Sequence, residues 1–386
     1  MTSTRIRALL AGALSLAVVT FPTPPSAPAE AALAGPSSVT LEGRGYGHGR
    51  GMSQYGAQGA ASEHDRTHRQ ILRFYYPGLA FGTAPGVIRV QISGDTSDDV
   101  VIDDRRRLSV RQVATGDSWA LRQDGAKRWR LTAAVGGATR VSVLTDRWRS
   151  VRTVPGEAEL RAARGALALV TPSGVTRYQG ALRSTVVDGG RDTVNVVRLE
   201  AYLRGVVPRE VPALWPPEAV KAQAVAARTY AAFHRADSQG DPYDLCDTTS
   251  CQVYGGLDDR HPASDAAIRA TAGEVLLAAG TPAFTEFSSS NGGWTVAGSV
   301  PYQVAKQDDW DPVNAWRTTL RATTIENAYP AIGDFQRLRI LRRDGNGTWN
   351  GRVLRIRIVG SNATPAVDGD DFRSVFGLRS TWFRVV

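Results

Sequence analysis

The residues best suited to chemistry lie in one stretch near the middle of the chain. A single carboxylate, Glu210, stands between two prolines, and a further pair, Pro216 and Pro217, precedes an alanine-rich run. Proline is tolerated in the first turn of a helix, because the N–H that it lacks has no intrahelical partner there. We therefore predict a helix over residues 217–235, with Glu210 just ahead of it. A carboxyl beside apolar side chains can hold its proton and act as a general acid.

The predicted helix carries polar residues that could face a ligand. Lys221 and Arg228 are seven residues apart and fall on nearly the same helix face, with Thr229 beside them. Lysine is rare in this chain, because only three of its 46 basic residues are lysines. Lys221 therefore indicates a place that needs a compact ammonium group. The alternative is an ordinary solvated helix face.

The N-terminus has the features of an export signal. Arg5 and Arg7 precede an apolar run over residues 8–19, and small residues at Ala32 and Ala34 suit a cleavage site. We predict that residues 1–34 are a signal peptide and that the mature protein is secreted to the cell wall without a transmembrane segment.

The net charge of +9 fits anionic wall polymers better than nucleic acid in an exported protein. An arginine-rich composition alone is the other explanation of this charge.

The remaining pattern predicts an α+β fold, with antiparallel β-rich regions around a central helical catalytic segment. Residues 35–80 form a glycine-rich motif segment with helices near 53–61 and 67–75. Residues 81–175 alternate apolar and polar side chains between turns, which indicates a β-rich insertion.

Residues 176–386 form the predicted catalytic domain. Besides the helix at 217–235, it has helices near 199–206 and from Ser264, as N-cap, to 272. Its last strands are predicted at 338–341, 353–359 and 382–386.

Six separate motifs resemble the stage II sporulation protein D family, the SpoIID/LytB-like envelope proteins. They cover residues 45–57, 202–212, 215–219, 221–230, 246–254 and 287–295. The resemblance implies lytic cleavage of peptidoglycan glycan strands with Glu210 as the catalytic group. It also implies that Lys221, Arg228 and Thr229 line the active site.

A lytic transglycosylase fits the shortage of carboxylates near Glu210. Its one carboxyl serves as general acid and base while the C6 hydroxyl of MurNAc attacks the anomeric carbon and leaves a 1,6-anhydro end. A hydrolase would need two carboxyls, and Glu200 and Glu218 have ordinary helical explanations. The alternative function is a non-catalytic wall-binding protein that stimulates an amidase, as in the LytB-like branch. Sporulation, division and general wall turnover stay open.

The order of the motifs differs from the family pattern. The glycine-rich motif at 45–57 lies near the N-terminal end here, whereas in the family it follows the last strand. We interpret this as a circular permutation, which requires strand 39–42 to lie beside 382–386 and His48 to lie beside Glu210.

The remaining predicted substrate-binding residues come from three motifs. They are Gln54 and Tyr55 in the first, Gln223 on the predicted helix, and Ser289 and Ser290 in a loop that a plain turn would also explain.

Cys246 and Cys251 are the only two cysteines, and an exported protein is expected to join them in a disulfide. Some relatives bind zinc through two cysteines and a histidine, so zinc is the alternative. No other cofactor is expected.

Overall fold

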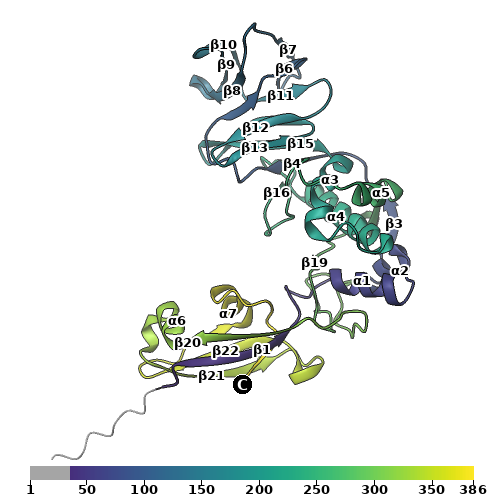
Figure 1. Cartoon of the computed structure of the whole chain (residues 1–386), viewed down its shortest axis with the longest axis vertical. Helices are drawn as coiled ribbons and strands as arrows, with labels where there is room; N and C mark the ends of the chain where they lie inside the picture. Colours follow the sequence, from purple (N-terminus) through teal and green to yellow (C-terminus); the bar gives the residue numbers. More distant parts are fainter. Residues whose placement is uncertain (1–34) are drawn as a thin grey trace, which may run out of the picture.

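The computed structural model describes residues 35–386, so the predicted signal peptide, residues 1–34, lies outside the described residues. The described chain is α+β, as predicted. Figure 1 shows three regions in a row: a β region, a helical region in the middle, and a second β body that holds the C-terminus. No helix within residues 35–386 is both long and apolar enough to cross a membrane.

The first β region consists of two sheets that share one core with the neighbouring helices. The strand orders are β16-β4-β15-β14-β11-β6-β7 and β10-β9-β8-β5-β12-β13. The strands are β4 (Val87–Gln91), β5 (Val100–Asp103), β6 (Leu108–Gln112), β7 (Ser118–Leu121), β8 (Arg128–Ala133), β9 (Thr139–Leu144), β10 (Trp148–Val154), β11 (Ala158–Ala162), β12 (Leu167–Thr171), β13 (Gly174–Tyr178), β14 (Ala181–Val187), β15 (Gly190–Arg198) and β16 (Leu245–Cys246). Strand β11 pairs with β14, so the first sheet runs across the boundary predicted at residue 175.

The helical region holds five helices. They are α1 (Gln54–Glu63), α2 (His68–Tyr75), α3 (Leu199–Glu210), α4 (Pro217–Asp237) and α5 (Pro262–Ala270). Short strands flank them: β2 (Met52–Ser53), β3 (Ala80–Thr83), β17 (Glu274–Ala278), β18 (Thr281–Pro282) and β19 (Phe287–Ser288). Ser53 caps α1, and Thr67 closes a capping box on α2, and both helices begin one residue after the predicted starts at 53 and 67.

Two predicted helix bounds were wrong. Helix α3 continues through Pro208 to Glu210 instead of ending near residue 206, and it ends because Val211, which precedes Pro212, is extended. Helix α5 begins at Pro262, not after Ser264, because the His261 side chain accepts the Ala263 N–H and acts as the cap.

Helix α4 is the centre of the helical region. Val220, Ala224 and Ala227 pack into the core of the first β region. Ala222 and Ala226, on the other side, pack against α1, α2 and β17. The alanines therefore allow close helix packing and do not make room for a ligand.

The C-terminal body packs two three-stranded sheets and two helices around a separate core. The sheet orders are β20-β1-β24 and β21-β22-β23. Its elements are β1 (Ser38–Arg44), β20 (Ala315–Arg321), α6 (Ala322–Ala328), β21 (Phe335–Arg343), β22 (Val353–Gly360), β23 (Ala366–Asp368), α7 (Gly369–Val375) and β24 (Phe383–Val385). Leu41 of β1 and Phe383 of β24 pack there with Ile356 of β22.

The first described strand pairs with the last one. Leu41 lies opposite Val385 and Glu42 lies opposite Arg384 in an antiparallel ladder. The predicted proximity of segments 39–42 and 382–386 is therefore confirmed. The permuted order relative to the family stays a prediction.

Candidate active site

Glu210 lies in a pocket of about 260 Å³ at the junction of several segments. The lining residues are His48, Arg50, Glu210, Tyr230, Thr249, Ser250, Cys251, Val253, Glu286 and Phe287. They come from the glycine-rich loop before β2, the end of α3, the middle of α4, the cysteine loop and the start of β19. The fold thus assembles the pocket from residues more than 200 positions apart.

The Glu210 carboxyl is partly buried and held by two donors. The Val253 N–H donates to Oε1 at 3.2 Å, and the Gln54 amide donates to Oε2 at 3.3 Å. Burial raises the pKa of Glu210, and these two hydrogen bonds only partly oppose it. Its place at the carboxyl end of α3 also disfavours the charged form. Glu210 therefore keeps its proton more readily than a solvated glutamate does, as a general acid must.

Gln54 reaches Glu210 because α1 begins directly before it. The Ser53 hydroxyl accepts the Gly56 N–H at 3.0 Å, which fixes the first turn of α1 and the position of Gln54. Tyr55 instead stands outside the pocket lining. Its ring lies 5.1 Å from the ring of Trp215, measured between centroids.

His48 occupies a loop that only glycine-rich sequence can form. Gly47 and Gly49, on either side, have φ angles of 105° and 76°, in the region that glycine adopts readily. The structure confirms that His48 lines the same pocket as Glu210. Because His48 Nδ1 accepts the Arg50 N–H at 3.0 Å, the neutral ring carries its proton on Nε2.

His48 stays neutral at physiological pH. Burial, helped by the nearby positive charge of Arg50, lowers the pKa of His48 to about 4. Within residues 35–386, His48 makes a side-chain hydrogen bond through Nδ1 and none through Nε2, so the Nε2 N–H is available to a ligand.

A second carboxylate in the pocket, Glu286, was missed at the level of sequence. Arg50 donates to it from Nε at 3.0 Å and from Nη2 at 2.8 Å. Burial opposes ionisation of Glu286, but the hydrogen bonds and charge of Arg50 outweigh it and lower its pKa. The sequence could have indicated Glu286 only through its place next to a motif. Glu286 directly precedes the motif at 287–295, and its partner Arg50 lies within the motif at 45–57.

The prediction that Arg228 and Thr229 line the pocket was wrong. Arg228 is fully buried and donates to both carboxylate oxygens of Glu200, at 2.7 and 2.9 Å. The Thr229 hydroxyl donates to the Val225 carbonyl and accepts the Leu276 N–H. Tyr230, by contrast, lines the pocket. Because Arg228 precedes Tyr230 by two residues, or about 200° around the helix axis, Arg228 faces the opposite side of α4.

Lys221 and Gln223 also lie outside the pocket lining. The Lys221 ammonium pairs with Glu218 at 2.6 Å, in a partly buried ion pair. Gln223 lies seven residues before Tyr230, on the same side of α4, but it is fully buried. Its amide has no hydrogen-bond partner within the described chain.

The two serines after β19 also differ from the prediction that they bind substrate. The Ser290 hydroxyl is fully buried and donates to Asp311 at 2.8 Å, which fixes the turn that follows. Ser289 contributes its carbonyl, which accepts the Tyr55 N–H at 3.0 Å. Neither serine is part of the pocket lining.

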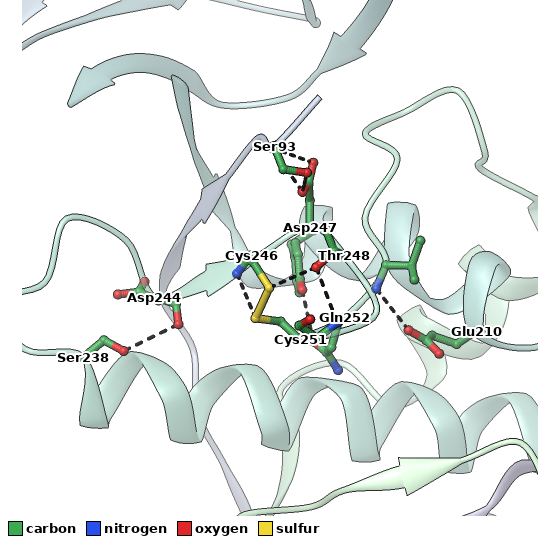
Figure 2. Close-up of a disulfide and its surroundings, with 12 residues drawn as sticks. Ser93, Glu210, Ser238, Asp244, Cys246, Asp247, Thr248, Cys251 and Gln252 are labelled. Atoms are coloured by element: carbon green, nitrogen blue, oxygen red, sulfur yellow. Dashed lines mark hydrogen bonds between the residues drawn. A yellow bond between two sulfur atoms is a disulfide. The ribbon is translucent and has the colours of Figure 1, made fainter. Parts of the chain in front are cut away.

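Cys246 and Cys251 form the expected disulfide, which Figure 2 shows beside Glu210. The bond uses both sulfurs that the zinc alternative would need. Two residues beyond Cys251, Val253 donates to Glu210, and Gln252 between them accepts the Tyr202 hydroxyl at 3.0 Å. The disulfide therefore holds one wall of the pocket against the end of α3.

Comparison with known proteins gives a consistent result for this part of the chain. Residues 187–277 match the family described as "SpoIID: Stage II sporulation protein". The amidase enhancer of Bacillus subtilis (strain 168) is 42% identical over 130 residues, which are 32% of this chain and 17% of that protein. Stage II sporulation protein D of Bacillus amyloliquefaciens is 27% identical over 217 residues, 50% of this chain and 61% of that protein.

The alignments leave much of each protein unmatched. The chain spans 17% of the amidase enhancer and 61% of the sporulation protein. The matched segment nevertheless contains α3, α4 and the cysteine loop, which together supply Glu210 and the groups around it. The similarity of the chain to the SpoIID family therefore extends over residues 187–277.

Proposed function

We propose that this protein is an exported lytic transglycosylase that cleaves the MurNAc–GlcNAc strands of peptidoglycan. The observation that carries this proposal is the setting of Glu210. Its carboxyl lies in an accessible pocket, and burial raises its pKa. The same pocket presents the His48 ring and the hydroxyls of Thr249 and Ser250, which suit the oxygen atoms of a sugar.

The reaction returns Glu210 to its starting state. The protonated carboxyl gives its proton to the glycosidic oxygen as the bond to C1 of MurNAc breaks. The C6 hydroxyl then attacks C1, and the Glu210 carboxylate takes the hydroxyl proton. The products are a free GlcNAc hydroxyl and a 1,6-anhydro MurNAc end, and no water is consumed.

The state of Glu286 supports a reaction with a single catalytic carboxyl. A retaining hydrolase would use a second carboxylate as nucleophile, and an inverting one would use it to activate water. Both oxygens of Glu286 accept hydrogen bonds from Arg50. That engagement weakens Glu286 as a base or nucleophile, and we assign it the role of holding Arg50 in the pocket wall.

A second candidate function is stimulation of a wall amidase, which the name of the amidase enhancer relative suggests. An apolar cavity of about 480 Å³ between the start of α4 and α5 favours it. Leu214 at its rim is 82% exposed. This surface suits contact with another protein, and it does not require Glu210 to carry a proton.

Purified protein incubated with glycan strands that lack stem peptides tests the proposal. We expect 1,6-anhydro ends from the natural protein and at least a hundredfold fewer from Glu210→Gln, since general acid catalysis contributes about 10²–10⁴-fold. Glu63→Gln, an exposed change of the same kind on α1, is the matched control. Equal product from all three proteins would remove Glu210 from the mechanism. No product from any of them would favour the amidase-stimulating function.

A further inference from the structure

A row of arginines occupies one face of the C-terminal body. Strands β21 and β22 pair in an antiparallel ladder in which Arg339 lies opposite Arg357 and Arg342 lies opposite Arg355. Arg337 lies two residues before Arg339 and thus on the same face. We call these five residues the arginine strip: Arg337, Arg339, Arg342, Arg355 and Arg357.

The alternate residues of the two strands face the other way. Leu338, Ile356 and Ile358 are buried in the core between the two sheets of the body. The strip therefore lies on the outer face of sheet β21-β22-β23, with Arg337, Arg339 and Arg342 exposed.

The strip is poorly neutralised within the protein. Asp368 on the neighbouring β23 pairs with Arg355 at 2.8 Å. The other four arginines form no ion pair with any carboxylate of residues 35–386. Like charges directly opposite each other destabilise an antiparallel ladder, so Arg339 and Arg357 work against the stability of this sheet. Opposed arginines therefore do not stabilise the fold, and binding of an anionic ligand would account for them.

We propose that the arginine strip binds a polyanionic polymer whose backbone carries regularly spaced phosphodiester groups. Arginines two residues apart are separated by about 6.8 Å along a strand, and those on paired strands by about 4.8 Å. Guanidinium groups bind phosphate oxygens through paired N–H donors. A chain of phosphodiesters laid along β21 and β22 would neutralise both members of the Arg339 and Arg357 pair.

The strip favours a polyol phosphate over a nucleic acid. Proteins that bind single-stranded nucleic acid stack its bases on aromatic side chains. The residues of β21 and β22 include Phe335 at the start of β21 as their only aromatic, and it is buried in the core. The face offers charge without a surface for bases.

The strip also adjoins the candidate active site. Arg342 lines a cavity of about 390 Å³ whose wall includes His48 and Arg50, and also the aspartates Asp344, Asp368, Asp370 and Asp371. His48 and Arg50 also line the Glu210 pocket. These carboxylates would repel a polyanion from the cavity, so the inference concerns the outer face of the sheet alone and does not depend on the enzymatic proposal.

Binding of a poly(glycerol phosphate) chain of about ten repeats tests the inference. The test pair is the Arg339→Gln/Arg357→Gln double variant and the Arg140→Gln/Arg147→Gln control, which removes the same charge from exposed positions of the first β region. We expect the affinity for poly(glycerol phosphate) to fall at least tenfold in Arg339→Gln/Arg357→Gln and less than threefold in the control. The slope of log affinity against log salt should fall by roughly 1.4 in the first, for two lost phosphate contacts.

Thermal unfolding separates binding from folding. Removal of the opposed charges should leave the melting temperature of Arg339→Gln/Arg357→Gln unchanged or raised. Equal losses of affinity in both double variants would reduce the strip to general surface charge and overturn the proposal. Tighter binding of a single-stranded oligonucleotide with the same number of phosphates would assign the strip to nucleic acid instead.

Discussion

Removal of the hydrogen bond from Gln54 to Glu210 should change the pH dependence of the reaction. Gln54 is buried and donates to Oε2 at 3.3 Å, which favours the ionised carboxylate. Gln54→Met removes the donor while nearly preserving side-chain length. A hydrogen bond to a charged group contributes about 1.5–3 kcal/mol, and the long distance places this one at the lower end. Its loss should therefore change the ionisation equilibrium of Glu210 about tenfold toward the protonated form.

The assay is the pH profile of kcat/KM on glycan strands without stem peptides. Glu210 must be protonated to act as the acid, so its ionisation sets the alkaline limb of the profile. Gln54→Met should move this limb to higher pH by about one unit. Tyr55→Phe is the control, since the neighbouring Tyr55 packs against the ring of Trp215 and does not bond to Glu210. A limb that stays in place or moves to lower pH in Gln54→Met would refute the assignment of Glu210 as the acid.

Three further predictions concern the groups around Glu210. Glu286→Gln should lower the free energy of unfolding by about 1–2 kcal/mol, because the partly buried Arg50 loses its charged partner. Urea unfolding measures this change. The reaction products of the variant should still carry 1,6-anhydro ends. The pKa of His48 is about 4 in the folded chain and about 6.5 in the unfolded chain, so acidification between these pH values protonates and favours the unfolded chain. His48→Gln removes this effect and should therefore reduce the loss of melting temperature between pH 6.5 and 4. An equal loss in both proteins would contradict the neutral ring. The paired change Cys246→Ser/Cys251→Ser should cost about 2 kcal/mol for so short a loop and lower kcat by loosening the Val253 N–H, as urea unfolding and kinetics would show.

Local signals in the sequence predicted the helices well. Ser53, Thr67 and Pro217 mark helix starts through hydrogen bonds and φ angles that act within one turn. The predicted end of α3, near residue 206, was four residues too early. Pro208 stands in the last turn, and the extended residue before Pro212 ends the helix instead.

The composition of the pocket was less predictable, because it depends on contacts between distant segments. The periodicity of α4 correctly grouped Lys221 with Arg228, but it could not say which side of the helix meets the pocket. Which side meets the pocket depends on a contact outside the helix, since the buried Arg228 pairs with Glu200 of α3. The Arg50–Glu286 pair joins residues 236 positions apart and leaves no pattern in a single sequence.

The central claim is that the substrate hydroxyl, and not water, attacks the sugar while Glu210 carries the proton. Digestion of glycan strands in H₂¹⁸O, followed by mass spectrometry of the new MurNAc ends, tests it most directly. The account predicts ends that are lighter than a reducing end by one water and carry no ¹⁸O, and their loss in Glu210→Gln. Reducing ends that carry one ¹⁸O per cleavage would contradict it and would make Glu286 a candidate second carboxyl of a hydrolase.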